Sequence, residues 1–380
     1  MHQMKIWRVF CLGKKAIMKI KTITCHDVYN LGASLQAFAL QNYLESDGHE
    51  VEVIDYKPWY LSNHYKLWGV GNERFHKPIL WQLYNLAKFP ERVSALPRKK
   101  VFDEFTKKYL RLTKRYNSFE ELRANPPEAD VYVAGSDQIW NTTFNNGIDP
   151  AFYLNFGKAK KISYAASFAT EKLRKGTESF VKEMLDNFNE ISVREESGIN
   201  ILKSTGHNGT VVVDPVFLLS QDQWESVSDN IGEGKDYILV YSFEKGGAMQ
   251  KIAEQLSKQH HCPIYSVGPY KLKYASRNFV NVGPSSFLSL IKNAKCIISN
   301  SFHATAFSMI FEKNFFVVNR EDGLNTRMRD LLQKYGILDR LIGVNVTNQG
   351  LCSDIDYSKA NELLNRDIKL SMTYLANNLK

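Results

Sequence analysis

The alternation of short apolar runs with longer helical segments constrains this fold more than any other feature of the sequence. From Met18 onward, β-branched runs of a few residues are separated by segments with apolar residues at helical spacing, which is typical of a parallel α/β sheet. The pattern occurs twice and predicts two Rossmann-like, doubly wound α/β domains. Strands are expected in the first half at 19–24, 50–54, 130–134, 161–165, 190–193 and 210–213, and in the second half at 237–243, 263–267, 296–299 and 315–318.

Helices are expected between most of these strands. After the first strand, Leu31, Leu35 and Phe38 fall in one helical row. Gly48 is expected to end this helix, because glycine readily adopts the left-handed backbone that follows a helix terminus. Apolar spacing in the second half predicts helices at 284–292, 302–312, 326–334 and 358–378.

The length of 380 residues suits two domains better than one. The polar stretch 220–235, which contains two glycines, is the expected boundary between them. We therefore expect an N-terminal domain over 18–219, a C-terminal domain over 220–350, and a C-terminal helix within 351–380 that docks back on the body. Residues 1–17 precede the first strand and are expected to form an extended N-terminus outside the fold.

One stretch departs from the alternation and is expected to be a helical insertion, residues 57–115. It holds fourteen Lys or Arg against four acids, so its local excess accounts for the whole net charge of +9. Eleven aromatic residues are interleaved with the basic ones. This composition fits a solvated helical face, a surface for a lipid-linked substrate or the membrane, or a single-strand nucleic-acid groove. Nucleic acid is not expected, since no recognised nucleic-acid-binding fold accompanies the stretch.

The five cysteines indicate a reducing compartment. Their number is odd, and no two stand at a spacing typical of a zinc cage, so no metal site is expected. The apolar runs fall far short of the ~20 residues that a membrane-spanning helix requires. We therefore expect a cytoplasmic protein, with peripheral contact at the inner face of the membrane through 57–115.

Two polar clusters follow first-half strands, where open α/β sheets bind their ligands. The turn at Asn30 and Gly32 either lets an anion approach a helix N-terminus or simply caps the helix. The second cluster directly follows the strand at 130–134. Its acidic member, Asp137, is either a capping residue or an acid or base, and Trp140 is either a cleft residue or a core anchor. The cluster comprises Gly135, Ser136, Asp137, Gln138, Ile139, Trp140 and Asn141.

A third cluster, Ser299 to His303, follows the strand at 296–299 and opens a helix. The positive end of that helix favours a neutral imidazole at His303, which suits proton transfer near pH 7, although a buried structural histidine is the equal alternative. Arg194 ends a first-half strand and Arg327 begins a helix. Both can bind a carboxylate or phosphate, or pair with neighbouring acids.

Taken together, these segments resemble the polysaccharide pyruvyl transferase family. The matching stretches, in order, are TITCHDVYNLGASLQAFAL (22–40), VYVAGSDQIWN (131–141), ISYAAS (162–167), ISVREESG (191–198), VVVDPVFLL (211–219), CIISNSFHATAFSMIF (296–311) and NTRMRDLL (325–332). Their shared order makes the resemblance specific. It implies the GT-B architecture, in which two Rossmann-like halves face a cleft and a C-terminal helix returns to the first half.

The resemblance also implies an activity. Members transfer pyruvate from phosphoenolpyruvate to two hydroxyls of a sugar, forming a cyclic ketal on a bacterial surface polysaccharide or its lipid-linked precursor. The family's functional histidine falls on His303, and its strand-end arginine falls on Arg194. Many members carry Arg-Leu-His where this chain has Ser301, Phe302 and His303, so Arg327 is the candidate to supply the missing guanidinium. The reaction implies no metal or redox cofactor.

These expectations assign a role to each candidate residue. The partners implied are phosphoenolpyruvate and a glycan or polyprenyl-linked sugar acceptor. The catalytic residues expected are His303 and Asp137; the donor-binding residues are Arg194, Arg327, Ser301, Asn30 and Gly32; and the acceptor or cleft residues are Gly135, Ser136, Gln138, Trp140 and Asn141.

Two other functions fit the same two-domain pattern. A nucleotide-sugar glycosyltransferase of GT-B architecture would use the glycine pair in Glu244–Gly247 as a phosphate-binding turn. A non-catalytic protein that binds glycans or nucleic acid would keep the fold without turnover. The pyruvyl transferase predicts release of phosphate from phosphoenolpyruvate, and the glycosyltransferase predicts release of nucleotide. The non-catalytic protein predicts no turnover.

Overall fold

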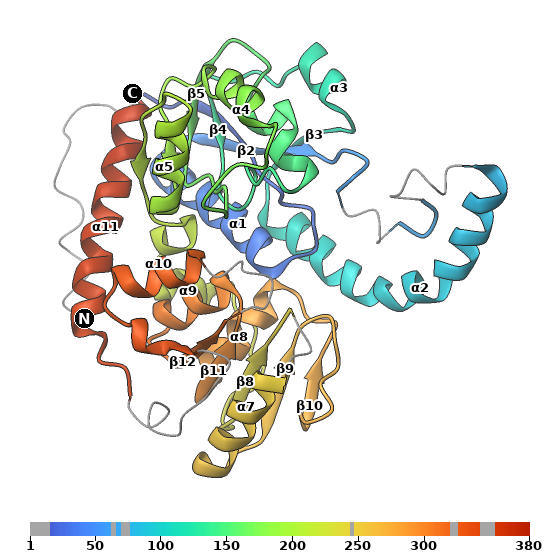
Figure 1. The fold of residues 1–380 in the computed structure, drawn as a ribbon, viewed down its shortest axis with the longest axis vertical. Helices are drawn as coiled ribbons and strands as arrows, with labels where there is room; N and C mark the ends of the chain where they lie inside the picture. The colour runs from blue at the N-terminus through green and yellow to red at the C-terminus, as the bar shows by residue number, and fades with distance from the viewer. Residues whose placement is uncertain (1–15, 62–65, 70–76, 244–246, 320–325, 343–353) are drawn as a thin grey trace.

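The first of two parallel sheets is built from the N-terminal half (Figure 1). The computed structural model describes residues 16–61, 66–69, 77–243, 247–319, 326–342 and 354–380. Bridges from Ala166 to Asp137 and to Val193 extend the pairing of the first sheet to two further short strands. In spatial order its strands are β3 (Leu112–Tyr116), β2 (Glu50–Tyr56), β1 (Lys19–Ile23), β4 (Val131–Ala134) and β5 (Lys160–Ser163), followed by the pair β6 (Ser192–Val193) and β7 (Thr210–Val211).

The second sheet repeats this topology. In spatial order its strands are β10 (Arg277–Phe279), β9 (Ile264–Val267), β8 (Ile238–Tyr241), β11 (Cys296–Ser299), β12 (Asn314–Val318) and β13 (Leu341–Ile342). In each sheet the chain starts at the centre, builds to one side, and then returns to build the other. The order therefore reverses between β1 and β4 and between β8 and β11, and these are the points where such sheets bind ligands. The predicted α/β fold with two doubly wound parallel sheets is confirmed.

The first helix is held by its cap and by burial on nearly all sides. The side chain of Asn30 accepts hydrogen bonds from the amides of Gly32 and Ala33. Gly48 has a φ of 98°, as predicted for the residue that ends this helix. The helices outside the insertion are α1 (Leu31–Ser46), α3 (Phe119–Ala124), α4 (Glu178–Leu185), α5 (Glu196–Ser204), α6 (Gln221–Ser226), α7 (Gly247–His260), α8 (Pro284–Asn293), α9 (Phe302–Ile310), α10 (Thr326–Lys334) and α11 (Tyr357–Asn378).

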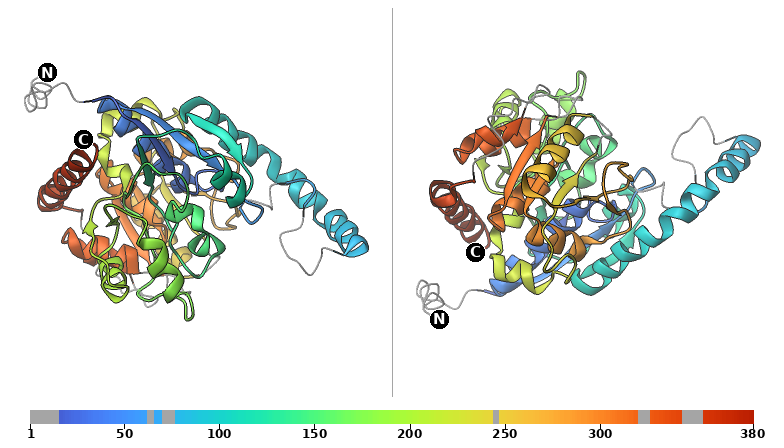
Figure 2. Two further views of the ribbon diagram at one scale, coloured as in Figure 1. Left: turned by 90° about the horizontal axis from the view of Figure 1, so that it is seen from above. Right: turned by 90° about the horizontal axis from the view of Figure 1, so that it is seen from below.

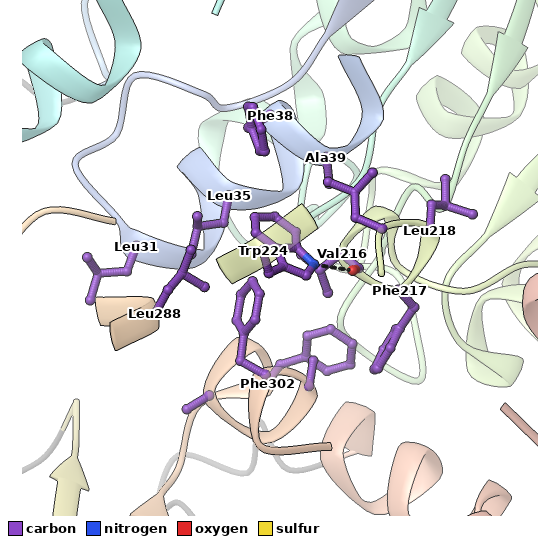
Figure 3. Packing of buried hydrophobic residues seen from close by; sticks show 14 of the residues in the cluster. Leu31, Leu35, Phe38, Ala39, Val216, Phe217, Leu218, Trp224, Leu288 and Phe302 are labelled. Atoms are coloured by element: carbon purple, nitrogen blue, oxygen red, sulfur yellow. Dashed lines mark hydrogen bonds between the residues drawn. The ribbon is translucent and has the colours of Figure 1, made fainter. Parts of the chain in front are cut away.

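The two halves share one apolar core. Figure 3 shows α1, the 3₁₀ segment Pro215–Leu218, α6, α8 and α9 meeting around Trp224. The Trp224 ring is fully buried, lies 4.9 Å from the ring of Phe307, and donates a hydrogen bond from Nε1 to the Val216 carbonyl. The start of the expected boundary 220–235 is thus part of the contact between the halves.

The helix α2 (Pro78–Tyr109) extends away from the body as an arm (Figures 1 and 2). Its C-terminal part packs against the body through Phe102 and Phe105, whereas Ile79, Leu83 and Leu86 are more than half exposed. The last residues of the expected insertion 57–115 form β3, the edge strand of the first sheet.

The C-terminal helix α11 contacts both halves. Tyr374 donates from its hydroxyl to the carbonyl of Ser163, and Ser371 accepts from the amide of Val213. At its other end, Tyr357 donates to the carbonyl of Lys313. The predicted return of the C-terminal helix to the first half is therefore confirmed. Of the expected N-terminal extension 1–17, residues 1–15 lie outside the described residues. No helix in the described parts of the chain is long and apolar enough to cross a membrane.

Candidate active site

The predicted site residues converge where the carboxyl ends of both sheets face each other. Gly32 follows β1, Asp137 follows β4, and His303 follows β11, so the two topological switch points meet. Ser301 caps α9, because its Oγ accepts from the amide of Ala304 at 3.4 Å. This cap places His303 in the first turn of the helix.

Gly32 makes room for the imidazole of His303. A Cβ added at Gly32 would lie 2.0 Å from Nδ1 and 2.3 Å from Cγ of His303, closer than any side chain can approach. The glycine is therefore required by this contact between α1 and α9. Asn30 is occupied in capping α1, the alternative that the sequence left open.

The centre of the site is a carboxylate that sequence reasoning missed. Asp214 is 1% exposed, and its Oδ2 accepts from Arg194 Nη1 at 2.6 Å and from Ser136 Oγ at 3.0 Å. Its Oδ1 accepts from the amide of Val216, and His303 Nε2 lies 3.7 Å from its Oδ2. Burial alone would raise the pKa of Asp214, but His303 and Arg194 outweigh it and hold the pKa below its ordinary value.

Arg194 is enclosed by acids and by an aromatic ring. Besides the bond to Asp214, its guanidinium lies 3.7 Å from carboxylate oxygens of both Asp137 and Glu195. Its centre lies 4.3 Å from the centroid of the Phe302 ring. Burial would lower the pKa of Arg194, but the three carboxylates outweigh it and raise the pKa, so the arginine stays charged.

Polar atoms at this centre lack hydrogen-bond partners. Nε and Nη2 of Arg194 and Nε2 of His303 are buried and accept or donate no hydrogen bond. Buried polar atoms are nearly always satisfied in folded proteins, so an unsatisfied group of this kind is a candidate ligand site. Burial lowers the pKa of His303, against the opposing influence of Asp214, so the imidazole is neutral near pH 7.

A cavity of about 630 Å³ opens beside these groups. Arg194, Asp214 and Phe302 line it from one side, and Arg327 lines it from α10. Arg327 is 9% exposed, and with the Gln138 amide oxygen turned toward it, its Nη2 donates to that oxygen at 2.9 Å. Arg327 and Arg194 therefore reach one cavity, as the predicted donor-binding roles require.

Two of the expected acceptor residues do not line a cleft. Trp140 is fully buried, stacks on Tyr153 at a centroid distance of 5.5 Å, and donates from Nε1 to the Phe152 carbonyl. Asn141 is also fully buried, and its Oδ1 accepts from the amide and hydroxyl of Thr143. These contacts favour the core-anchor alternative for Trp140, and the assignment of both residues to the acceptor site stays a prediction.

The rest of the cluster after β4 supports the site through its backbone and side chains. Gly135 is buried and packs against Thr24, and Ser136 bonds Asp214. Asp137 has a φ of 72°, a strained conformation for a residue with a side chain, and its carboxylate faces Arg194. Such strain persists only where the surroundings enforce it, which marks Asp137 as a constrained position in the site.

Asp214 was missed because its sequence context is ordinary. It precedes a proline and is expected to cap a helix, which it does. Its only signal is its place directly after the apolar run 211–213. Glu195 is one of the neighbouring acids expected to pair with Arg194, and its Oε2 lies 3.7 Å from that guanidinium, while its Oε1 accepts from Ser167 Oγ at 2.7 Å and from the Ala169 amide at 3.0 Å. Among the described residues, no group of three or more His, Cys, Asp or Glu is arranged to hold a metal ion.

Arg194, Asp214 and His303 are thus buried together where the carboxyl ends of two parallel sheets meet. The sequence profile of the family described as polysaccharide pyruvyl transferase matches residues 30–322. The chain belongs to this family and is a transferase, as the resemblance implied. No curated protein matches the chain.

Several solved structures are similar to this chain in the course of the backbone. A UDP-N-acetylglucosamine 2-epimerase from Listeria monocytogenes, described as putative, is 11% identical, with 95% of each chain covered and a TM-score of 0.47. Arabidopsis thaliana UGT89C1 is 9% identical, with 96% of this chain and 98% of that chain covered, and the same TM-score. The glycosyltransferase SnogD from Streptomyces nogalater is 13% identical over 96% and 100%, with a TM-score of 0.44. At these scores the likenesses say nothing about substrate.

Proposed function

We propose that the protein transfers pyruvate from phosphoenolpyruvate to two hydroxyls of a sugar and forms a cyclic ketal on a surface polysaccharide or its lipid-linked precursor. The observation that carries this proposal is the group of buried, unsatisfied nitrogens on Arg194, which lines the cavity, and on His303, which lies 3.7 Å from the cavity-lining Asp214. A ligand with carboxylate and phosphate oxygens satisfies the arginine, and a proton to be transferred satisfies the histidine.

The donor is held by two guanidinium groups. Arg194 offers Nε and Nη2 to a carboxylate or phosphate, and Arg327 approaches the same cavity from the second half. Arg327 thereby takes the place of the arginine that the histidine motif lacks. The acids that line the cavity are as numerous as the basic residues, so the field there is balanced rather than strongly positive. The donor is therefore recognised by hydrogen-bond geometry more than by net charge.

The reaction moves two protons, one to the methylene carbon of the donor and one to the departing phosphate. His303 takes the proton of a sugar hydroxyl as that oxygen bonds to the central carbon of the donor, and passes it to the methylene carbon. The bond to phosphate then breaks, and the phosphate leaves with the electron pair. The second hydroxyl closes the ketal, and its proton passes through the carboxylate of Asp137 to the departing phosphate.

Each role follows from a contact. His303 is neutral near pH 7 and therefore able to accept a proton, a contribution of typically about 10² to 10⁴-fold in rate. Asp214 contacts both Arg194 and His303 and is a positioning residue. Arg194 offsets the charge that develops on the departing phosphate.

The arm α2 is proposed to meet the inner face of the membrane. Ile79, Leu83 and Leu86 repeat at helical spacing and are 73%, 58% and 69% exposed. Basic residues along the same arm complement anionic lipid headgroups. A cytoplasmic enzyme with this peripheral contact would meet lipid-linked acceptors where they are made.

Phosphate release from phosphoenolpyruvate tests the proposal. Wild-type protein and a His303→Ala variant are incubated with a panel of lipid-linked sugars, and the acceptor is analysed for the ketal. We expect acceptor-dependent phosphate release that falls by at least about 10²-fold in the variant. His207→Ala is the matched control, because His207 bonds Asp186 and Thr205 outside the site and its loss leaves the rate unchanged.

The same assay examines glycosyl transfer. Residues 244–246 of the turn that would bind a nucleotide lie outside the described residues, and no specific contact favours this alternative. Release of nucleotide from a nucleotide sugar, together with failure to bind phosphoenolpyruvate, would replace the pyruvyl proposal.

A further inference from the structure

A second cavity, of about 520 Å³, lies between the first sheet and the arm α2. We call it the basic pocket. The ammonium groups of Lys57 and Lys99 lie 5.0 and 5.7 Å from the centroid of its Tyr29 ring, and Arg115 and the exposed Lys66 and Lys107 also line it. The full lining is His26, Asp27, Tyr29, Lys57, Lys66, Lys99, Asp103, Thr106, Lys107, Leu112, Arg115 and Asn117.

The basic pocket lies at the ligand-binding edge of the sheet. His26 and Asp27 follow β1, Lys57 follows β2, and Arg115 is at the end of β3. These are the carboxyl ends of adjacent parallel strands, on the side of β1 away from β4. The pocket therefore shares the edge at which the candidate active site is built.

The charge of the basic pocket differs from that of the first cavity. Its five Lys and Arg exceed its two Asp by three, and by two when the buried Asp55, which bonds Arg115 at 2.9 Å, is counted. Lys57 pairs with Asp27, and Lys99 pairs with Asp103. In the described part of the chain, Lys66 and Lys107 form no ion pair, so they supply the excess positive charge. An anion with two negative charges balances it.

An apolar groove continues from the basic pocket along α2. The groove shares Lys99, Asp103 and Lys107 with the pocket and adds Val93, Leu96, Pro97, Lys100 and Glu104, and its exposed surface is mainly apolar. Val93 and Leu96 are 41% and 36% exposed, and the groove leads toward the exposed leucines of the arm. A ligand that fills both has a doubly charged group joined to an apolar chain.

The basic pocket is connected to His303 through one short loop. Tyr29 lines the pocket, and Gly32, three residues further along, contacts the imidazole. Three residues span at most about 11 Å, so the backbone at Tyr29 and the backbone that contacts His303 lie within that distance of each other.

From these observations we infer that the basic pocket binds the diphosphate of a lipid-linked sugar acceptor, with its apolar chain in the groove along α2 and its sugar directed toward His303. The inference rests on the proposed function for the identity of the acceptor. It adds a binding site distinct from the cavity lined by Arg194 and Arg327, which we call the donor cavity, and it assigns Lys66 and Lys107 a ligand.

Binding of inorganic pyrophosphate, measured by calorimetry on the full chain, tests the pocket without turnover. The wild type is compared with a Lys66→Ala/Lys107→Ala double variant, in which neither substitution removes an ion pair. Lys182→Ala/Lys251→Ala is the matched control, because both lysines are exposed on other helices and the charge change is identical. We expect the first double variant to bind pyrophosphate about ten-fold more weakly and the control to bind like the wild type.

Two further probes identify the source of the diphosphate. Farnesyl diphosphate binds more tightly than pyrophosphate if the groove takes the chain, and a Leu96→Glu variant removes that difference. Equal binding by the wild type and the Lys66/Lys107 double variant would overturn the site, and tighter binding of UDP than of farnesyl diphosphate would overturn the lipid assignment. A protein that binds these probes but releases no phosphate from phosphoenolpyruvate would refute the proposed function and leave the diphosphate site standing.

Discussion

The donor cavity and the basic pocket lie at the same edge of one sheet, yet they handle charge in opposite ways. Arg194, Asp214 and Glu195 are buried and Asp137 is partly buried; Asp214 bonds Arg194, and the two other carboxylates lie 3.7 Å from its guanidinium. In the basic pocket Arg115 and Lys99 are partly exposed, and positive charge is in excess. The first arrangement fixes the geometry of a few atoms, whereas the second attracts an anion from solution.

This difference indicates which ion pairs lose most free energy when one partner is substituted. A buried ion pair loses several kcal/mol when one partner is removed, because the other charge remains without compensation. A pair exposed to solvent is screened and contributes little. Substitutions in the donor cavity should therefore affect stability and rate together, while those in the basic pocket affect binding alone.

The largest expected effect is that of Asp214→Asn. The substitution removes the carboxylate bonded to Arg194 and leaves that guanidinium buried with its two more distant acids. We expect a loss of about 3 kcal/mol in the free energy of unfolding by urea and of about 10²-fold or more in kcat. Asp236→Asn, which breaks an exposed pair with Lys295, is the control and should leave both unchanged.

The pH dependence of the same variant sharpens the comparison. Asp214 raises the pKa of His303, against the larger lowering by burial. Its removal therefore lowers the pKa of His303 further, and the acid limb of kcat/KM moves to lower pH. An acid limb that moved to higher pH would show that another group controls it.

A smaller loss of activity is expected from Gly32→Ala. Gly32 contacts His303 and lies three residues after Tyr29 of the basic pocket. Because the added methyl would overlap the imidazole, His303 must move, and we expect kcat to fall by about 10²-fold. Pyrophosphate binding in the basic pocket should persist. The control is Gly247→Ala, since a Cβ there meets nothing within 4 Å. Unchanged kcat in the Gly32 variant would mean that the position of His303 is not critical.

The smallest effect is expected at the end of the arm. A Leu83→Glu/Leu86→Glu variant should bind vesicles containing anionic lipid about ten-fold more weakly, because two exposed apolar side chains no longer enter the interface. Turnover of a water-soluble acceptor should not change. Leu370→Glu, on the equally exposed Leu370 of α11, is the control. Equal vesicle binding by all three proteins would refute membrane contact through α2.

Much of the fold could be predicted because the central strands β4, β8 and β11 are almost wholly apolar. The strands β1, β4, β8 and β11 are buried almost throughout and have helices on both sides in the sequence. The edge strand β3 has the sequence LTKRY and is largely exposed, so neither apolar content nor alternation distinguishes it from the insertion. It forms because β2 offers it backbone partners, which a local pattern does not reveal.

The site was predicted in part for a related reason. His303 and Arg194 follow strands that the pattern identifies, so their convergence follows from topology. Trp140 follows such a strand as well, but its ring turns into the core because burial of a large apolar side chain outweighs contact with a cleft. Asp214 was missed because its importance arises from partners distant in the sequence, among them Ser136 and His303.

The shared core around Trp224 has a consequence for how this family can diversify (Figure 3). The Trp224 ring contacts Phe38 from the first half and Phe307 from the second. Either half alone would therefore expose apolar side chains that the other half covers. A chimera that joins the first half of one relative to the second half of another must carry over the whole set of packing partners. The exposed part of the arm α2, by contrast, can vary without repacking that junction.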